Sequence, residues 1–273
     1  MAARGAAVLM PPSSFPASYG SAIVRFQTDT KEHPRAIKVT KASSRPREER
    51  GVSGVWIAGN AVVVVTSLVI MSYLYYLRIP AAGRRWPWAS ATIIAVTAVV
   101  TGLQFAYPGL LDALRRDPNG LSDGEVWRLV TPVFVQSSGV TQAALNAFLA
   151  LVFLPVTERL YGKGLWLVYF GPGVVYQIVN LMLFPDNGSG SSSAIFGAMG
   201  AMHAYVLRHK QIDRPFMVIS MVSIAAAVVL AIFRDGHGWG LLAGALFSLL
   251  LLRPKRAPAP LPVPSEEGQT GRR

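Results

Sequence analysis

The chain of 273 residues contains no cysteine and few charged residues. The absence of cysteine excludes disulfide bonds, thiolate metal ligands and a cysteine nucleophile. Charged residues make up 15% of the chain and apolar residues 52%, whereas a typical soluble domain is about 25% charged. This balance favours a membrane protein over a soluble one. We expect no metal ion and no cofactor.

The few charges are unevenly distributed. The net charge is +12, and its basic residues gather in the tails and in short connections, with seven Lys or Arg between residues 31 and 50. No aromatic residues alternate with them, as they would in many nucleic-acid-binding segments. The expected partner of this charge is therefore the anionic surface of a lipid bilayer, and not nucleic acid. The sequence carries no signal for an oligomeric state.

Long apolar runs dominate the rest of the chain. Backbone groups inside a bilayer must be hydrogen-bonded within the chain, so such runs are expected to be helices. Seven segments qualify, the last of them short for a span: 55–77, 88–107, 142–160, 165–184, 192–207, 215–233 and 237–252. The sequence therefore predicts an all-α membrane protein that crosses the bilayer several times.

Three polar stretches flank or interrupt these segments. Residues 1–52 are rich in Pro, Ser and Ala and are predicted to be a disordered basic N-terminal tail, and residues 253–273 a disordered C-terminal tail. Residues 108–140 form a long connection with apolar content of its own, which is expected to pack on or into the membrane face.

Basic residues mark alternate connections. By the positive-inside rule these connections are cytoplasmic, and residues 108–140 and 185–191 face the other side. With seven spans, the basic N-terminal tail would also lie on that other side. The sequence leaves open whether the tail is translocated or the first segment does not span simply.

A Gly/Ser stretch, residues 188–193, runs directly into an apolar segment that begins at Ser192. A hydroxyl there lies at a helix N-terminus, where free N–H groups favour a developing negative charge, although capping alone also explains serine at this place. His237 opens the last apolar segment, two helices later, at the same membrane surface. Asn146 and Gln142, one turn apart, enter from that surface, so four polar groups converge at one depth.

Small residues follow both Ser192 and His237. Gly240 and Gly244 form one small face, and Gly197 and Ala201 form another. Such faces let two helices approach closely, as a hydroxyl–imidazole hydrogen bond between their ends requires. His203 would lie about 16 Å deeper than Ser192 by helical rise, and it is expected to serve helix packing.

Together these motifs resemble those of the rhomboid intramembrane serine proteases over about residues 88–252. The matching residues are Ser192 before Ala-Ile-Phe-Gly197, His237 with Gly240 and Gly244, the pair Trp127-Arg128, Glu158 with Gly162, and Asn146. Their order and spacing follow the family pattern. The resemblance implies a six-helix transmembrane core over residues 88–252, preceded by one additional N-terminal transmembrane helix at 53–80.

The resemblance also implies an activity, the cleavage of transmembrane segments of other membrane proteins by a serine endopeptidase. A dyad of Ser192 and His237, without a carboxylate, would carry the reaction. Asn146, Gln142 and the Ser192 backbone N–H would hold the oxyanion.

Two residues depart from the family pattern. Gln142 stands where the family has His, but its amide can still donate a hydrogen bond. Ser193 stands where the family has Gly, so Ser191 and Ser193 stay open as nucleophiles.

Two other functions compete with proteolysis. A non-proteolytic rhomboid-like protein that binds membrane clients is one, and only Gln142 favours it. A small transporter or channel is the other, but the chain shows no internal repeat and no charge in the middle of a span. The expected location is a bacterial cell membrane. An organellar inner membrane is the alternative, because the first 28 residues contain no acid.

Overall fold

The computed structural model describes residues 47–78, 86–183, 186–209 and 212–251. All of them belong to one compact unit, residues 45–273. The expected C-terminal tail and residues 1–46 of the expected N-terminal tail lie outside the described part of the chain.

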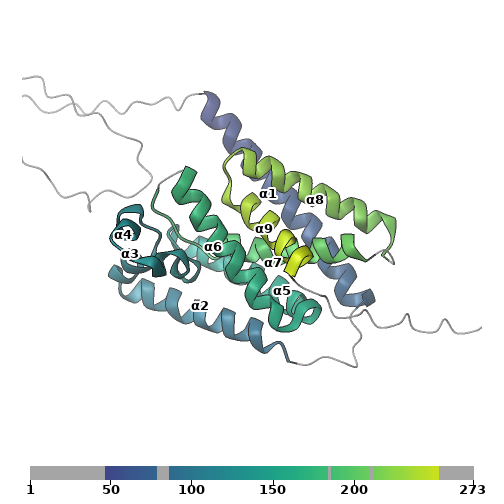
Figure 1. The fold of residues 1–273 in the computed structure, drawn as a ribbon, viewed down its shortest axis with the longest axis horizontal. Helices are drawn as coiled ribbons and strands as arrows, with labels where there is room; N and C mark the ends of the chain where they lie inside the picture. The colour runs from purple at the N-terminus through teal and green to yellow at the C-terminus, as the bar shows by residue number, and fades with distance from the viewer. Residues whose placement is uncertain (1–46, 79–85, 184–185, 210–211, 252–273) are drawn as a thin grey trace, which may run out of the picture. The chain divides into compact units, whose positions relative to one another are not determined.

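All the regular elements among the described residues are helices, which confirms the all-α class (Figure 1). The long helices are α1 (Arg47–Tyr73, continued by the π-helical turn η2, Leu74–Arg78), α2 (Trp88–Ala106), α5 (Gly139–Tyr161), α6 (Leu165–Leu183), α7 (Ser192–Arg208), α8 (Arg214–Ile232) and α9 (Gly236–Leu251). Short helices join them: α3 (Gly109–Leu114), α4 (Pro118–Ser122), η4 (Val126–Leu129), η5 (Thr131–Phe134) and η6 (Gly162–Gly164). Among these residues the one β feature is an isolated bridge between Arg116 and Gly188.

Two helical features go beyond the predicted segments. Helix α1 begins at Arg47, inside the tail that was expected to end at residue 52. Its first residues, Arg-Glu-Glu-Arg, are good helix formers, and a stable helix extends at little cost into such a sequence. The long connection 108–140 contains four short helices, α3, α4, η4 and η5.

Within the described ranges, four helical stretches are long and apolar enough to cross a membrane: Ser53–Tyr76, Trp88–Ala106, Gly139–Leu183 and Arg214–Ile232. The third contains both α5 and α6, which η6 separates. Helix α9 is a shorter apolar helix. The number of seven spans therefore stays a prediction.

Helix α7 lies among the other helices. It contacts α1, α5, α6, α8 and α9 (Figure 1), and every residue from Ser193 to Val206 is buried. A helix without a polar face is expected to be enclosed in this way. His203 is fully buried within it, where its two ring nitrogens contact the hydroxyls of Ser67 on α1 (2.9 Å) and Ser220 on α8 (3.2 Å). This histidine thus takes part in helix packing, as expected.

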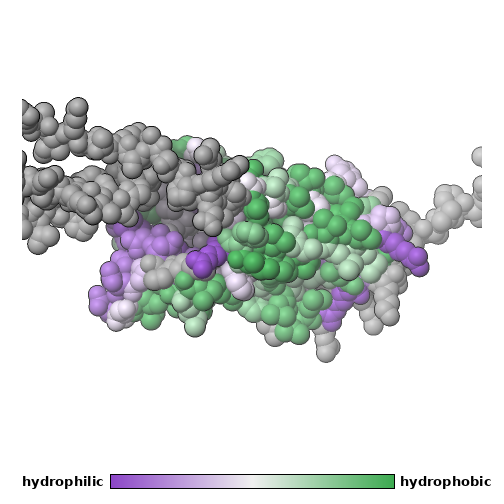
Figure 2. All heavy atoms as spheres, turned by 90° about the horizontal axis from the view of Figure 1, so that it is seen from above, coloured by the Kyte–Doolittle hydropathy of each residue, from purple (hydrophilic) through white to green (hydrophobic). Residues whose placement is uncertain are grey.

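The outer helices carry the exposed apolar side chains. Many large hydrophobic residues of α1, α2, α5 and α8 are more than a third exposed. Figure 2 shows apolar residues over the middle of one face and hydrophilic residues toward both of its sides. Such a band is typical of a surface that contacts lipid.

Candidate active site

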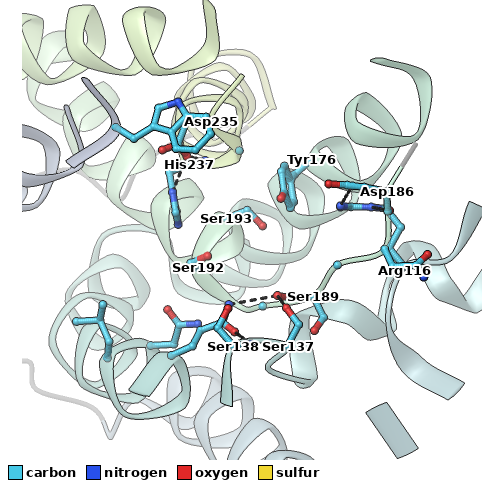
Figure 3. A pocket seen from close by; sticks show the side chains of 18 of the residues that line it. Arg116, Ser137, Ser138, Tyr176, Asp186, Ser189, Ser192, Ser193, Asp235 and His237 are labelled. Carbon is cyan, nitrogen blue, oxygen red and sulfur yellow. Dashed lines mark hydrogen bonds and ion pairs between the residues drawn. The ribbon is translucent and has the colours of Figure 1, made fainter. Parts of the chain in front are cut away.

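The segment before α7 is tied to the connection between α2 and α5. The Gly190 N–H donates to the Pro132 carbonyl (2.9 Å). The Ser189 carbonyl accepts from the Ser137 hydroxyl (3.1 Å) and from Gln142 Nε2 (3.2 Å) (Figure 3). These bonds fix the approach to Ser192, the first residue of α7. The first N–H groups of a helix have no partner inside it, so this end can stabilise an anion.

Helices α7 and α9 pack backbone to backbone. A Cβ atom at Gly240 would collide with the backbone of Ser193, and one at Gly244 with the backbone of Gly197. Because neither collision partner is a flexible side chain, only glycine permits this approach. The contact brings the beginning of α9, where His237 lies, next to the beginning of α7.

Ser192 and His237 line the same pocket, which has a volume of about 580 Å³ (Figure 3). Asn146, Gln142 and Ser193 also line it. The ring of Phe196, one turn into α7, packs on the ring of His237 with 4.6 Å between their centroids. The structure thus brings together all four polar residues that the sequence placed at one depth.

The three neighbouring serines have different surroundings. Ser191 is 2% exposed, and its hydroxyl accepts from Gln136 Nε2 (3.3 Å). Ser193 is also 2% exposed, and its hydroxyl has no hydrogen-bond partner among the described residues. Ser192 is partly exposed at the pocket.

The amides of Gln142 and Asn146 are anchored by neighbours. Gln142 Oε1 accepts from the Ser138 N–H (2.8 Å), and its Nε2 donates one hydrogen to Ser189. Asn146 Nδ2 donates one hydrogen to Gln136 Oε1 (2.8 Å). Each amide nitrogen keeps a second hydrogen that could be donated into the pocket.

Gln136 is a residue that the sequence analysis missed. It is 1% exposed, and Gln104 on α2 holds its backbone through two hydrogen bonds, of 2.9 and 2.8 Å. Its side chain in turn orients Asn146 and contacts Ser191. A glutamine in a loop carries no periodic or motif signal, so only the fold could identify it.

His237 has a carboxylate neighbour, Asp235, to which the sequence analysis gave no role. Asp235 Oδ1 lies 2.6 Å from His237 Nδ1 and accepts the His237 backbone N–H at 2.9 Å. Burial favours the neutral acid, but the hydrogen bonds and charge of His237, with a bond from Asn60, outweigh it and hold the pKa of Asp235 below its ordinary value. A carboxylate two residues before the histidine was visible in the sequence, but an acid before a helix usually indicates only a cap.

The remaining motif residues support the site from a distance. Arg128 donates to the carbonyls of Asp112 (2.7 Å) and Arg115 (2.9 Å) and pairs with Glu125, while Trp127 Nε1 contacts the Ala113 carbonyl (3.4 Å). These bonds hold the short helices between α2 and α5 together.

Glu158 joins two long helices. Its carboxylate, near the end of α5, accepts the backbone N–H groups of Ala89 (3.0 Å) and Ser90 (2.7 Å) and the Ser90 hydroxyl (2.7 Å) at the start of α2. Gly162 ends α5 with a φ of 60°, a conformation that favours glycine.

Arg116 is a second residue that the sequence did not single out. It is 2% exposed, and it donates to Gln177 Oε1 (2.7 Å) on α6 and to the carbonyl (3.0 Å) and carboxylate (2.5 Å) of Asp186 (Figure 3). It thereby ties the segment before α7 to α6, at the edge of the same pocket.

Comparisons with known proteins point to one family. A family model described as the Rhomboid domain matches residues 123–254. The Bacillus subtilis (strain 168) protein named "Putative rhomboid protease YdcA" is 31% identical over 178 residues, which cover 60% of this chain and 89% of that protein. Rhomboid protease GluP of the same organism is 30% identical over 142 residues, 50% of this chain and 28% of that protein. Rhomboid-like protease 1 of Toxoplasma gondii is 26% identical over 205 residues, 69% of this chain and 63% of that protein.

Proposed function

This chain belongs to the rhomboid family, and from that premise we propose that it is an intramembrane serine endopeptidase with Ser192 as nucleophile and His237 as base. One observation carries the proposal. Ser192 and His237 begin two helices that touch backbone to backbone, and both line one pocket. A hydroxyl and an imidazole arranged in this way are the parts of an activated nucleophile.

The reaction proceeds by acyl transfer. His237 takes the proton of the Ser192 hydroxyl as its oxygen attacks a peptide carbonyl carbon. The tetrahedral intermediate collapses when His237 returns the proton to the leaving amine, and water then hydrolyses the ester by the same steps. The Ser192 N–H and the free amide hydrogens of Asn146 and Gln142 stabilise the oxyanion. Loss of one such donor typically costs about 10²–10³ in rate.

The substrates would be membrane proteins whose spanning helix unwinds locally. An intact helix uses its carbonyls in its own hydrogen bonds, so it offers no bond for attack. Water would reach the site through the polar rim of the pocket, which includes Ser137, Ser138, Asn187 and Ser189.

The protein is a multi-pass integral membrane protein. Within it, α2 to α9 would form the six-helix protease domain, residues 88–252, and α1 the additional N-terminal span. The bacterial cell membrane stays the expected location, with an organellar inner membrane as the alternative.

Labelling by a fluorophosphonate probe tests the proposal, because such a probe reacts with an activated serine. Wild type should be labelled, and Ser192→Ala and His237→Ala should not. Ser191→Ala and Ser193→Ala are the matched controls, which should keep most of the labelling. Loss of label in Ser193→Ala alone, with the protein folded, would move the nucleophile by one residue.

A protein that binds membrane clients without cutting them is the second candidate. The observation that favours it is the Gln142 amide, which is bonded to Ser189 and Ser138 where the family has a histidine. Absence of label in folded wild type would favour this candidate.

A further inference from the structure

We infer that Asp235 and Asn60 form a positioning relay behind His237: Asn60 orients the Asp235 carboxylate, and Asp235 orients the imidazole of His237 toward Ser192. The inference rests on the proposed function, since it assigns roles to residues that act through the proposed base. Asn60 lies on α1, which is outside residues 123–254 matched by the family model.

The geometry of the carboxylate carries the first step. Asp235 Oδ1 lies 2.6 Å from His237 Nδ1, and the aspartate side chain is only 9% exposed. An ionised carboxylate can only accept hydrogen bonds, so His237 Nδ1 must be the protonated nitrogen. The lone pair of neutral His237 is therefore on Nε2, the nitrogen that is free to take a proton from Ser192. The same carboxylate would stabilise the imidazolium that forms when the proton moves.

Capping explains only part of this contact. As the residue before α9, Asp235 accepts the N–H of His237, as a capping aspartate does. The bond to the imidazole and the bond to Asn60 are not needed to cap a helix. A cap would also serve with asparagine in place of aspartate, because both are preferred at this position.

The second step is the contact with α1. Asn60 Nδ2 donates to Asp235 Oδ2 at 2.7 Å, over 175 residues of sequence. One turn earlier, Trp56 Nε1 donates to the Phe233 carbonyl (2.8 Å) at the end of α8. Helix α1 is thus bonded at two points to the turn that carries Asp235. With His237 holding Oδ1 and Asn60 holding Oδ2, the carboxylate has a single orientation.

The relay predicts a specific kinetic defect. In full-length protein in detergent, Asp235→Asn should lower the maximal rate of fluorophosphonate labelling by about 100-fold or more, since an amide can stabilise the wrong tautomer of the histidine. The probe concentration at half-maximal rate should not change, because probe binding is untouched. Asn60→Leu should lower the maximal rate about 10-fold, because the carboxylate stays but loses its orientation.

Ser67→Ala is the matched control. Ser67 is another buried polar residue of α1, and its hydrogen bond goes to His203, away from the pocket. Its removal should change thermal stability but not the labelling rate. If α1 had only a structural role, Ser67→Ala and Asn60→Leu would instead have the same effect on thermal stability and the same effect on the labelling rate.

The outcomes separate the two proposals. Wild-type labelling rates in Asp235→Asn would overturn the relay and leave the protease assignment intact. Labelling of wild type that survives Ser192→Ala would overturn both. Should Asp235→Asn fail to fold, Asn60→Leu still decides, because a wild-type rate in that variant removes α1 from the relay.

Discussion

Gly244 of α9 lies directly against the backbone of Gly197 in α7, and a Cβ atom on Gly244 would collide with that backbone. This contact lies two turns from His237 and just over one turn from Ser192. It sets the distance between the two helices whose N-terminal ends hold Ser192 and His237. The geometry of the site therefore depends on two glycines that take no part in the reaction.

Gly244→Ala should therefore weaken both stability and activity. The new methyl group would meet the backbone of Gly197, which cannot rotate away, and overpacking of this kind costs about 1–3 kcal/mol. Thermal unfolding in detergent and the fluorophosphonate labelling rate measure the two effects. Gly102→Ala is the control, since nothing lies within 4 Å of the added methyl group. Equal stability of the two variants would contradict the close packing.

Gln142 gives a second prediction. If its free amide hydrogen stabilises the oxyanion, Gln142→Ala should lower the turnover of a model membrane substrate by about 10-fold or more. Gln142→His should keep or raise turnover, because a neutral imidazole also offers one N–H donor. If Gln142 only anchors Ser189 and Ser138, both changes should appear in stability and not in rate.

An inactive wild type with an active Gln142→His variant would be the most informative result for this residue. It would make the natural protein a binding relative of the proteases. Equal thermal stability of the three proteins is the necessary control.

Glu158 gives a prediction about stability alone. Glu158→Ala removes three hydrogen bonds to the beginning of α2, two of them to backbone N–H groups that then have no partner. Loss of a helix cap costs about 0.5–2 kcal/mol, and thermal unfolding should show a loss in that range. Asp112→Asn, which breaks an exposed ion pair with Arg115, should cost less than about 1 kcal/mol. A similar loss in both variants would argue against the capping role.

Asp235 gives a prediction about pH. Because its folded pKa lies below the ordinary value, the ionised form stabilises the folded state, and this stabilisation is present above the unfolded pKa of about 4. The stability advantage of wild type over Asp235→Asn should be present at neutral pH and be lost as the pH falls below about 4. Arg116, Tyr176, Asp186 and Arg234 line the same pocket and are unchanged in this comparison. An advantage that stays constant down to pH 2 would contradict the shift.

The sequence by itself determined the helices and the positions of Ser192 and His237 at the beginnings of two of them. Apolar runs that must satisfy their own backbone give helices whose limits depend on local residues, so the segments beginning at Ser192 and His237 were predicted within one residue. The small residues after both positions also indicated a close approach, because glycine spacing is a local pattern.

Only the tertiary structure decided which residues surround Ser192 and His237. Asn60 reaches Asp235 over 175 residues, and Gln136 reaches Ser191 over 55. Neither bond follows from periodicity, since a hydrogen bond between distant segments depends on how whole helices pack. Asp235 is two residues from His237, and its role still became visible only with the fold, because the same aspartate would cap α9 whether or not its carboxylate faced the imidazole.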